Sequence, residues 1–431
     1  MTKKKKIQKH KHRRNAGGTA AFLKGAIFMY QKTVIAEEAK HHDCFYLYDE
    51  NIIMQSIEKM KQTFPQVTFL YSLKCNPNPH VIRSIYAQGF GADAASLGEV
   101  LMSRDAGLSK DRIYYSAPGK TLAELREGMK YAVIIADSLS EVERIDRLSA
   151  EEGVVTEIGV RLNPDISFYG GEALPSKSGV DEQQFFAFLK ENDCKHIRIT
   201  GIHSHLKSQV LDAAALANYQ KNILALAERV EAACGYPLAY VNLGSGVGIP
   251  FALSDAPVDM EVLQASAKEH FDAFLAAHPH TRLFVETGRF TVGKSGVYVT
   301  KVVDKKVSCG VNYVILKNTF NGFVRPSIGM MVEKYNDNPM PIEPMFTTKN
   351  AFQILPLKET DAPVEKVTLV GNLCTAADVI AEDIELPRLD FDDVIVITNA
   401  GAYAAVVSPM QFSSHEKPAE LFLRTDGTVV L

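Results

Sequence analysis

A lysine follows an apolar run in the stretch YSLKCNPNP, residues 71–79. The preceding residues, Val67–Leu70, are apolar and partly β-branched, which predicts a strand that is buried on both faces. The Asn and Pro residues after Lys74 predict a turn, and the pattern of His80–Ala87 predicts a helix. Lys74 is therefore expected where a buried strand ends and a loop begins.

A partly buried lysine in such a position is suited to forming a Schiff base. Burial disfavours the charged ammonium and is expected to lower the pKa of Lys74, which leaves a neutral amine free to condense with an aldehyde. The alternative is an ordinary lysine at a strand end that extends its charge into solvent. This stretch favours neither alternative, so the rest of the chain has to decide.

Further residues suited to chemistry stand at the ends of five other predicted strands. They are Asp93, Arg161, His205 and Ser208 in HSHLKSQ (203–209), Gly244, Ser245 and Gly246 in GSGVG (244–248), and Glu286 and Arg289 in ETGR (286–289). Each motif has an ordinary alternative, such as a tight turn for the glycines or a surface ion pair for Glu286 and Arg289. A core position is the alternative for His205. Their shared position at strand ends favours one common site.

Eight candidate strands alternate with helix-like segments such as Asp212–Ala233 and Asp259–Ala276. The strands are Thr68–Leu73, Phe90–Ala94, Ile113–Ser116, Ala132–Ala136, Thr156–Leu162, Ile199–His203, Tyr240–Leu243 and Arg282–Val285. Eight strand–helix units within residues 45–286 predict an α/β fold, a (β/α)8 TIM barrel. Such barrels carry their active sites at the C-terminal ends of the strands, where the residues above fall.

After Glu286 the pattern changes to β-type runs that are divided by turns. These runs are Ser295–Val307, Val311–Leu316, Val364–Val370, Asp393–Thr398 and Glu420–Leu423. They predict a second, mostly antiparallel β-domain of the barrel or sandwich type, expected to comprise residues 21–44 and 287–431. Asn336–Thr347, which is rich in Asn, Pro and Met, is expected to be a loop.

The composition excludes several classes of protein. The 431 residues are 46% hydrophobic and carry a net charge of −4, which argues against nucleic acid as the main partner. No apolar run reaches the roughly 18 residues of a membrane span. Six cysteines without CxxC spacing argue against zinc or other metal sites and favour a reducing, cytoplasmic location. Residues 1–20 are expected to be a disordered basic tail, for which RNA, an acidic carrier protein or a membrane surface are alternative partners.

Together the candidate residues fit one cofactor. A Gly-rich loop presents N–H groups to a phosphate, and Arg289 adds a charged clamp. A Schiff-base lysine, a phosphate cradle and an acid for a pyridinium nitrogen predict pyridoxal 5′-phosphate, with Glu286 at the nitrogen and His205 against the ring. The alternative ligand is a sugar phosphate in an aldolase-type barrel, which leaves Glu286 and the second domain without a role.

From about Phe45 to Leu423 the chain resembles the fold-type III pyridoxal phosphate-dependent decarboxylases. That family includes diaminopimelate, ornithine and arginine decarboxylases, and alanine racemase shares its barrel. The matching motifs, in chain order, are YSLKCNPNP, GADAASLGEV, RLNPD, SKSG, HSHLKSQ, LGSGVGIPF, ETGR, GNLCTAAD and NAGAYA.

The resemblance implies a role for each matching residue. Lys74 would carry the cofactor, Glu286 would bind the pyridine nitrogen and His205 would stack on the ring. The phosphate would be held by Ser208, Gly244, Ser245, Gly246, Arg289 and Tyr403, and Asp93 and Arg161 would complete the cofactor site. The family's sites lie at a dimer interface, so Cys374 would enter the partner's pocket and protonate the carbanion that remains after CO2 leaves. A buried structural cysteine is the alternative for Cys374.

Departures from the family pattern concern the substrate. Thr375 stands where diaminopimelate decarboxylases carry Glu and ornithine decarboxylases carry Asp to hold a distal amine. Arg325 matches an arginine that helps to bind substrate carboxylate, but Gly329 replaces the tyrosine expected four residues later, and Lys207 replaces a glycine. Loss of a carboxylate opposite a buried ammonium typically costs about 2–5 kcal/mol. A substrate with a free distal amine is therefore not expected.

The sequence thus predicts a cytoplasmic, homodimeric α-decarboxylase of an amino acid or amino-acid derivative. Its substrate would be a small molecule, or an amino acid tethered to a carrier protein, or a siderophore or other secondary-metabolite intermediate, contacted by Arg325, Thr375 and Tyr403. Three alternatives stay open: a diaminopimelate decarboxylase of lysine biosynthesis, an amino acid racemase or epimerase, and a non-catalytic regulator that binds the cofactor.

Overall fold

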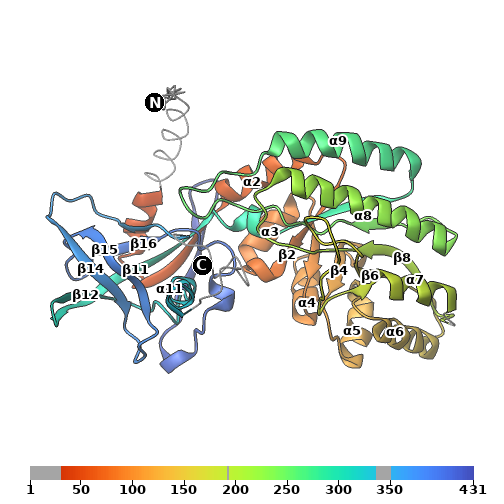
Figure 1. Ribbon diagram of the computed structural model, residues 1–431. Helices are drawn as coiled ribbons and strands as arrows, with labels where there is room; N and C mark the ends of the chain where they lie inside the picture. The colour runs from red at the N-terminus through yellow and green to blue at the C-terminus, as the bar shows by residue number, and fades with distance from the viewer. Residues whose placement is uncertain (1–30, 192–193, 336–350) are drawn as a thin grey trace, which may run out of the picture.

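The computed structural model describes residues 31–191, 194–335 and 351–431, which form a barrel and a separate β-sheet domain beside it (Figure 1). The basic tail expected at residues 1–20 and the loop expected at Asn336–Thr347 lie outside the described residues.

Eight parallel strands close into the barrel, as the sequence predicts. They are β2 (Thr68–Ser72), β3 (Gly91–Ala94), β4 (Ile113–Ser116), β5 (Val133–Ala136), β6 (Thr156–Asn163), β8 (Ile197–His203), β9 (Tyr240–Asn242) and β10 (Arg282–Thr287). Pairing of β10 with β2 and of β5 with β6 completes the ring, and the short β7 (Val180–Asp181) adds to β6. The prediction of a (β/α)8 barrel is confirmed.

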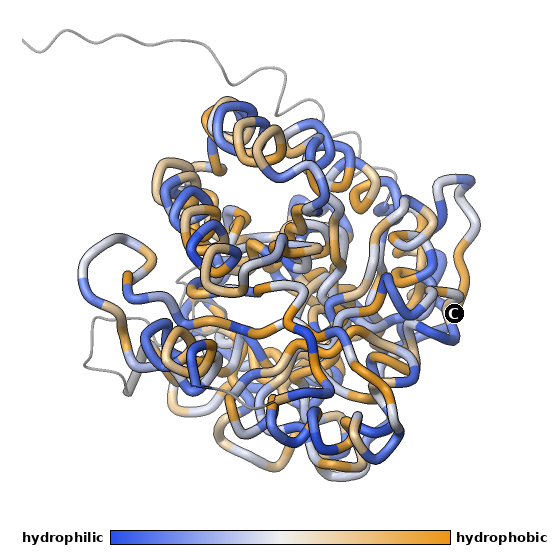
Figure 2. Tube along the Cα trace, turned by 90° about the vertical axis from the view of Figure 1, so that its right-hand side faces the viewer, coloured by the Kyte–Doolittle hydropathy of each residue, from blue (hydrophilic) through white to orange (hydrophobic). Residues whose placement is uncertain are grey.

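Helices surround the barrel with their apolar sides turned toward the strands (Figure 2). They are α2 (Glu50–Thr63), α3 (Pro79–Ala87), α4 (Leu97–Asp105), α5 (Leu122–Tyr131), α6 (Leu139–Glu152), α7 (Glu182–Glu191), α8 (Ala213–Cys234) and α9 (Met260–Ala277). Local sequence sets their ends: Thr121 and Glu124 form a reciprocal capping box at α5, and Gly235 ends α8 in the left-handed conformation.

Aromatic side chains fill the barrel interior. Tyr114, Tyr240 and Phe284 pack with Leu70 and Ile135 in one buried cluster. The Tyr240 ring occupies the space beside β8, because a Cβ at Gly201 would stand 2.2 Å from that ring. The interior is therefore a packed core and not a channel, which leaves the strand ends as the place for a ligand.

The second domain is one mixed sheet of nine strands. They are β1 (Cys44–Asp49), β11 (Gly296–Ser308), β12 (Val311–Leu316), β13 (Ile354–Pro356), β14 (Val364–Gly371), β15 (Val379–Pro387), β16 (Val394–Ile397), β17 (Ala419–Leu423) and β18 (Val429–Val430). Among the described strands all pairings are antiparallel except β1–β17 and β12–β14, so the prediction of a mostly antiparallel domain is confirmed. The helix α11 (Arg325–Tyr335) was not expected from the sequence.

One strand lies on the other side of the expected boundary. Residues from Phe45 onward were expected to belong to the barrel, but β1 pairs with β11 and β17 in the second sheet. Its burial pattern, in which all six side chains are buried, is that of a central strand of either sheet. The pattern of the sequence alone therefore does not distinguish the two positions.

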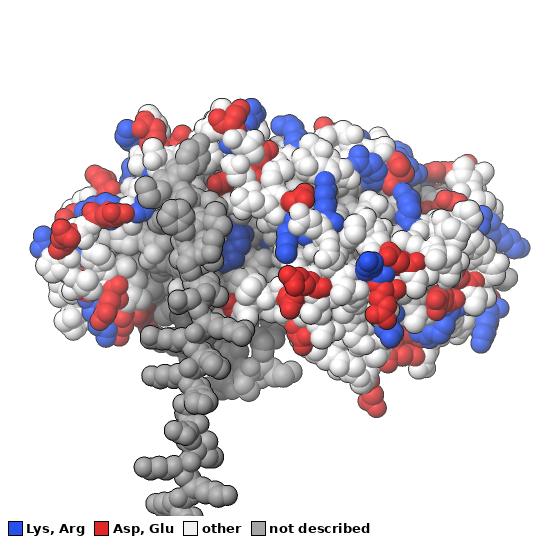
Figure 3. Space-filling model, turned by 90° about the horizontal axis from the view of Figure 1, so that it is seen from above, with Lys and Arg blue, Asp and Glu red and all other residues white. Residues whose placement is uncertain are grey.

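The surface carries both signs of charge. Figure 3 shows Lys and Arg interspersed with Asp and Glu over the visible face. In the described ranges no helix is both long enough and apolar enough to cross a membrane.

Candidate functional site

The ends of the barrel strands and the second domain together enclose a cavity at the mouth of the barrel. It is lined by Ser72, Lys74, Cys75, His205, Ser208, Gln209, Ser245, Gly246, Val247, Glu286, Gly288, Arg289 and Tyr403. Most of the candidate residues are therefore brought together from segments far apart in the sequence. Asp93 and Arg161 contact residues of this lining.

Lys74 lies in the one-turn helix η1 (Leu73–Cys75), directly after β2. Its Nζ is 3.1 Å from Asp93 Oδ2, and 43% of its side chain is exposed. Burial acts to lower the pKa of Lys74, but the Asp93 and Glu286 carboxylates outweigh it and raise that pKa above its usual value. The expectation of a lowered pKa is therefore wrong for the protein without cofactor, because the sequence does not reveal the neighbouring carboxylates.

Asp93 is held by serines that sequence reasoning missed. Its carboxylate, 1% exposed, accepts hydrogen bonds from Ser72 Oγ at 2.8 Å and from Ser116 Oγ at 2.7 Å. Ser72 stands opposite Asp93 in the β2–β3 register, and Ser116 ends β4 on the other side. The sequence did carry a signal for this contact, because Ser72 and Ser116 are the last residues of β2 and β4, the two strands beside β3.

Glu286 lies one residue before the end of β10 and is only 4% exposed. Asn242 Nδ2 donates to its Oε1 at 2.9 Å, and His203 Nε2 lies 3.0 Å from the same oxygen. Burial acts to raise the pKa of Glu286, but His203 and Lys74 outweigh it and hold that pKa below its usual value. Glu286 is therefore an ionised group inside the protein, with two partners to which sequence reasoning assigned no role.

His205 is neutral at physiological pH. Burial, helped by the nearby positive charges of Arg161 and Lys74, lowers its pKa to about 4. The Ser245 N–H donates to His205 Nδ1 at 3.3 Å, so the proton of the neutral ring is on Nε2 and points to Ser208 Oγ at 3.0 Å. Arg161 Nη2 donates to the His205 carbonyl at 3.2 Å and supports the ring through the backbone.

The glycine loop needs its glycines. Gly244 and Gly246 have φ values of +59° and +112°, and a Cβ at either would stand 2.4 Å from the Ser204 carbonyl oxygen or 2.6 Å from the Lys207 carbonyl oxygen. Both the backbone conformation and the close packing therefore exclude a side chain. The loop thus keeps a bare backbone at the cavity wall, which is what a phosphate requires.

Arg289 supplies a buried cation next to this loop. Arg289 is 8% exposed, and its guanidinium lies 5.4 Å from the ring centre of Phe251 and 5.0 Å from that of Tyr403. The Tyr403 N–H donates to the Cys75 carbonyl at 2.8 Å. The segment that follows β16 is thereby fastened to the turn that carries Lys74, so the second domain completes the wall of the cavity.

Cys374 and Thr375 lie away from this cavity, in the loop between β14 and β15. Cys374 is exposed, with its Sγ 3.6 Å from Ser413 Oγ. The loop is held by Asp378, whose buried carboxylate accepts from Thr319 Oγ1 and from the Leu373 N–H. A role for Cys374 in a partner's site therefore stays a prediction.

Arg325 is placed behind the cavity wall rather than in it. It is 1% exposed, donates from Nη1 to the Ala402 carbonyl at 3.1 Å and lies about 5 Å from the ring centres of Phe251 and Phe352. Its expected contact with substrate stays a prediction that the described geometry does not favour.

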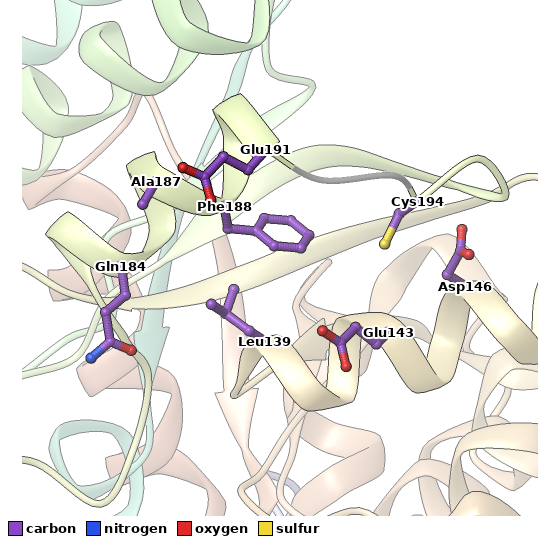
Figure 4. A pocket seen from close by; sticks show the side chains of 8 residues that line it. All are labelled: Leu139, Glu143, Asp146, Gln184, Ala187, Phe188, Glu191 and Cys194. Atoms are coloured by element: carbon purple, nitrogen blue, oxygen red, sulfur yellow. The ribbon is translucent and has the colours of Figure 1, made fainter.

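A second hollow lies on the outside of the barrel, between α6 and α7 (Figure 4). Its lining consists of Leu139, Glu143, Asp146, Gln184, Ala187, Phe188, Glu191 and Cys194. It contains none of the predicted site residues. The cavity at the strand ends is therefore the candidate active site.

The residues of that cavity fit pyridoxal 5′-phosphate. A buried, ionised carboxylate suits a protonated ring nitrogen, and a neutral imidazole offers a flat face to the ring. The glycine loop and the buried Arg289 suit the phosphate, and Lys74 offers the amine. The geometry therefore supports the cofactor that the sequence predicts.

The low pKa of His205 makes a prediction for acid stability. In the unfolded chain His205 is protonated below about pH 6.5, whereas in the folded chain it is protonated only near pH 4. The free energy of unfolding therefore decreases as the pH falls from about 6.5 to about 4. Between pH 7 and pH 5 the loss due to His205 is about 2 kcal/mol. In urea unfolding of the cofactor-free protein, His205→Asn should remove this part of the loss. The exposed His280 gives the control, and an equal effect of His280→Asn would contradict the assignment.

Comparisons with known proteins agree with this cofactor. The family model for the pyridoxal binding domain of pyridoxal-dependent decarboxylases matches residues 50–293. The L-glutamyl-(BtrI acyl-carrier protein) decarboxylase of Niallia circulans is 28% identical over 406 residues, which cover 91% of this chain and 92% of that protein. The diaminopimelate decarboxylase of Aquifex aeolicus is 26% identical, with 90% of this chain and 87% of that protein covered.

Solved structures show the same fold. The diaminopimelate decarboxylase of Helicobacter pylori complexed with L-lysine superposes with a TM-score of 0.75 at 24% identity, covering 90% of this chain and 92% of that chain. The diaminopimelate decarboxylase of M. jannaschii in complex with L-lysine gives a TM-score of 0.79 at 22% identity, covering 92% and 90%. The chain therefore belongs to the family of pyridoxal-dependent decarboxylases.

Proposed function

We propose that this decarboxylase acts on an amino-acid derivative without a free distal ammonium, and that an aminoacyl group tethered to a carrier protein is the favoured class. The observation that carries the proposal is Thr375, an uncharged residue at the position that the motif assigns to the distal group. Asp378 is not a substitute for the missing carboxylate. It is 2% exposed, and its oxygens accept from Thr319 Oγ1, the Phe320 N–H and the Leu373 N–H.

The residues of the cavity would divide the work of decarboxylation. When bound, pyridoxal phosphate supplies an electron sink for the pair left at the substrate Cα as CO2 departs. Glu286 would bind the ring nitrogen and, being negatively charged, would stabilise a proton there. His205, uncharged, would lie against the ring without adding positive charge. Lys74 would hold the cofactor through its amine, and Arg289 with the glycine loop would hold the phosphate.

The proton for Cα is proposed to come from Cys374 Sγ of a second subunit in a homodimer. The support is that Cys374 is exposed and does not line the cavity of its own chain, although its motif is the one that carries the family's acid. The hydrogen bonds of the buried Asp378 hold this loop in place, and the loop carries the Cys374 thiol at the surface. Lys74 is the alternative proton donor.

The relatives support two substrate classes. The protein from Niallia circulans is named for a glutamyl group on a carrier protein, which has no free distal amine, and this favours the proposal. Several other relatives are named diaminopimelate decarboxylase, which keeps the second candidate open. The two candidates differ in the charge that residue 375 has to meet, so a substitution there separates them.

Lys74→Ala is expected to abolish CO2 release and the visible absorbance band of the bound cofactor, because no other amine in the cavity lining replaces it. The measurement is an absorbance spectrum of the purified variant beside a CO2 assay. Lys74→Arg is the control that keeps the charge and removes the nucleophile, and it should be equally inactive. A variant that retained the band would refute the role of Lys74.

Thr375→Glu is expected to improve kcat/KM for free diaminopimelate by about tenfold or more, because it restores a charged partner for a distal ammonium. The measurement is CO2 release from a panel of free and carrier-tethered amino acids. Thr375→Gln, similar in size but uncharged, is the control. High activity of the native enzyme on free diaminopimelate would overturn the proposed substrate class, and racemisation without CO2 release would favour an epimerase.

Mixed dimers test the shared site. Lys74→Ala and Cys374→Ala subunits, each expected to be inactive or strongly impaired alone, should regain about one quarter of the native activity after mixing, since half of randomly paired dimers hold one intact site. Activity is measured before and after exchange of subunits. No recovery, despite exchange shown by mass, would mean that Cys374 serves its own chain or has no catalytic role.

A further inference from the structure

The turn that carries Lys74 holds a second side chain directed at the same carboxylate oxygen. Ser72 Oγ donates to Asp93 Oδ2 at 2.8 Å, and Lys74 Nζ lies 3.1 Å from that oxygen. Ser116 Oγ donates to the other oxygen, Oδ1, at 2.7 Å. Ser72 and Ser116 are 6% and 8% exposed. Asp93 therefore has a fixed neutral donor on each oxygen, and on Oδ2 a charged donor as well.

The local structure commits the Ser72 hydroxyl to Asp93. Ser72 is the N-cap residue of η1, a position where serine usually accepts a hydrogen bond from the backbone of the turn. Its side chain makes no such capping bond here. It stands opposite Asp93 in the β2–β3 register, and a Cβ at Gly288 would lie 3.2 Å from its own Cβ. The strand register thus brings the Ser72 hydroxyl to the Asp93 carboxylate.

We propose that Ser72 is a positioning residue for Lys74. The Ser72 hydroxyl shares Asp93 Oδ2 with the lysine and thereby weakens the attraction between the Asp93 carboxylate and the Lys74 ammonium. A carboxylate oxygen that already accepts one hydrogen bond attracts a second donor less strongly. When Lys74 leaves to react, Ser72 and Ser116 stay, so Asp93 is not left buried without partners. The inference rests on the proposed role of Lys74 and does not depend on the substrate.

The other titratable groups that face Lys74 leave this effect measurable. They include Tyr403, Glu286, Cys75, His205 and Glu99. Burial raises the pKa of Tyr403 and that of Cys75, and it lowers the pKa of His205 to about 4, so all three are uncharged at pH 8. Asp93, Glu286 and Glu99 are the carboxylates near Lys74, and the Ser72 hydrogen bond acts on Asp93.

The test is the reactivity of Lys74 in the full chain after removal of the cofactor. Competitive labelling with acetic anhydride, read residue by residue by mass spectrometry, reports the fraction of each lysine that is a neutral amine. At pH 8, Ser72→Ala should slow the labelling of Lys74 about threefold, as for a pKa higher by about half a unit. The exposed Lys130 in the same digest is the internal reference and should not change.

Ser116→Ala is the matched control, because it removes an equally buried serine donor from the oxygen that Lys74 does not share. It should slow labelling by much less than Ser72→Ala. Asp93→Asn removes the charge and should speed labelling about tenfold or more. Ser72→Cys, close in size with a weaker donor, should give an intermediate rate and serves if the alanine variant does not fold.

Labelling of Lys74 in Ser72→Ala at the native rate or faster would overturn the inference, and so would an equal effect of Ser116→Ala. Neither readout involves substrate or CO2. A wrong substrate class therefore leaves this result untouched, and a failed Ser72 test leaves the decarboxylase assignment untouched.

Discussion

The site depends on an ionised carboxylate that is kept almost out of water. Glu286 is 4% exposed, and an isolated carboxylate at that depth would be neutral. His203 and Asn242 prevent this by meeting one of its oxygens from β8 and β9, the strands that precede it around the barrel. The protein thus holds a buried negative charge at this wall, which suits a protonated ring nitrogen.

The sequence predicted the barrel well because its strands are short apolar runs, and six of them lead into a residue suited to chemistry, as at Lys74 and Glu286. Those runs are buried by the helices around them, and burial on both faces leaves a clear pattern. The protonation behaviour of Lys74 was predicted with the wrong sign. The Asp93 carboxylate that decides it comes from another strand, and pairing between strands is a property of the fold rather than of the local sequence. Ser72 and His203 were missed for the same reason.

Arg325 and Lys207 show what a motif leaves open. The matching position of Arg325 predicts contact with substrate, which stays a prediction, and in the fold its guanidinium lies 5.2 Å from the Phe251 ring centre and donates to the Ala402 carbonyl. Likewise Lys207, in place of a glycine, directs its ammonium to within 4.6 Å of the Tyr169 ring centre instead of into the cavity lining. A motif identifies the segment, whereas the direction of a side chain depends on what surrounds it.

The position of β1 has a consequence for biosynthesis. β1 lies between β11 and β17, so one of its edges is completed only by residues near the C-terminus. At usual ribosomal speeds, β17 is synthesised on the order of tens of seconds after β1. The barrel strands are synthesised within that interval. Until β17 follows, the edge of β1 that pairs with it has unpaired backbone N–H and C=O groups, and such an edge is prone to aggregation. Synthesis of β17, rather than closure of the barrel, is therefore the event that completes the sheet around β1.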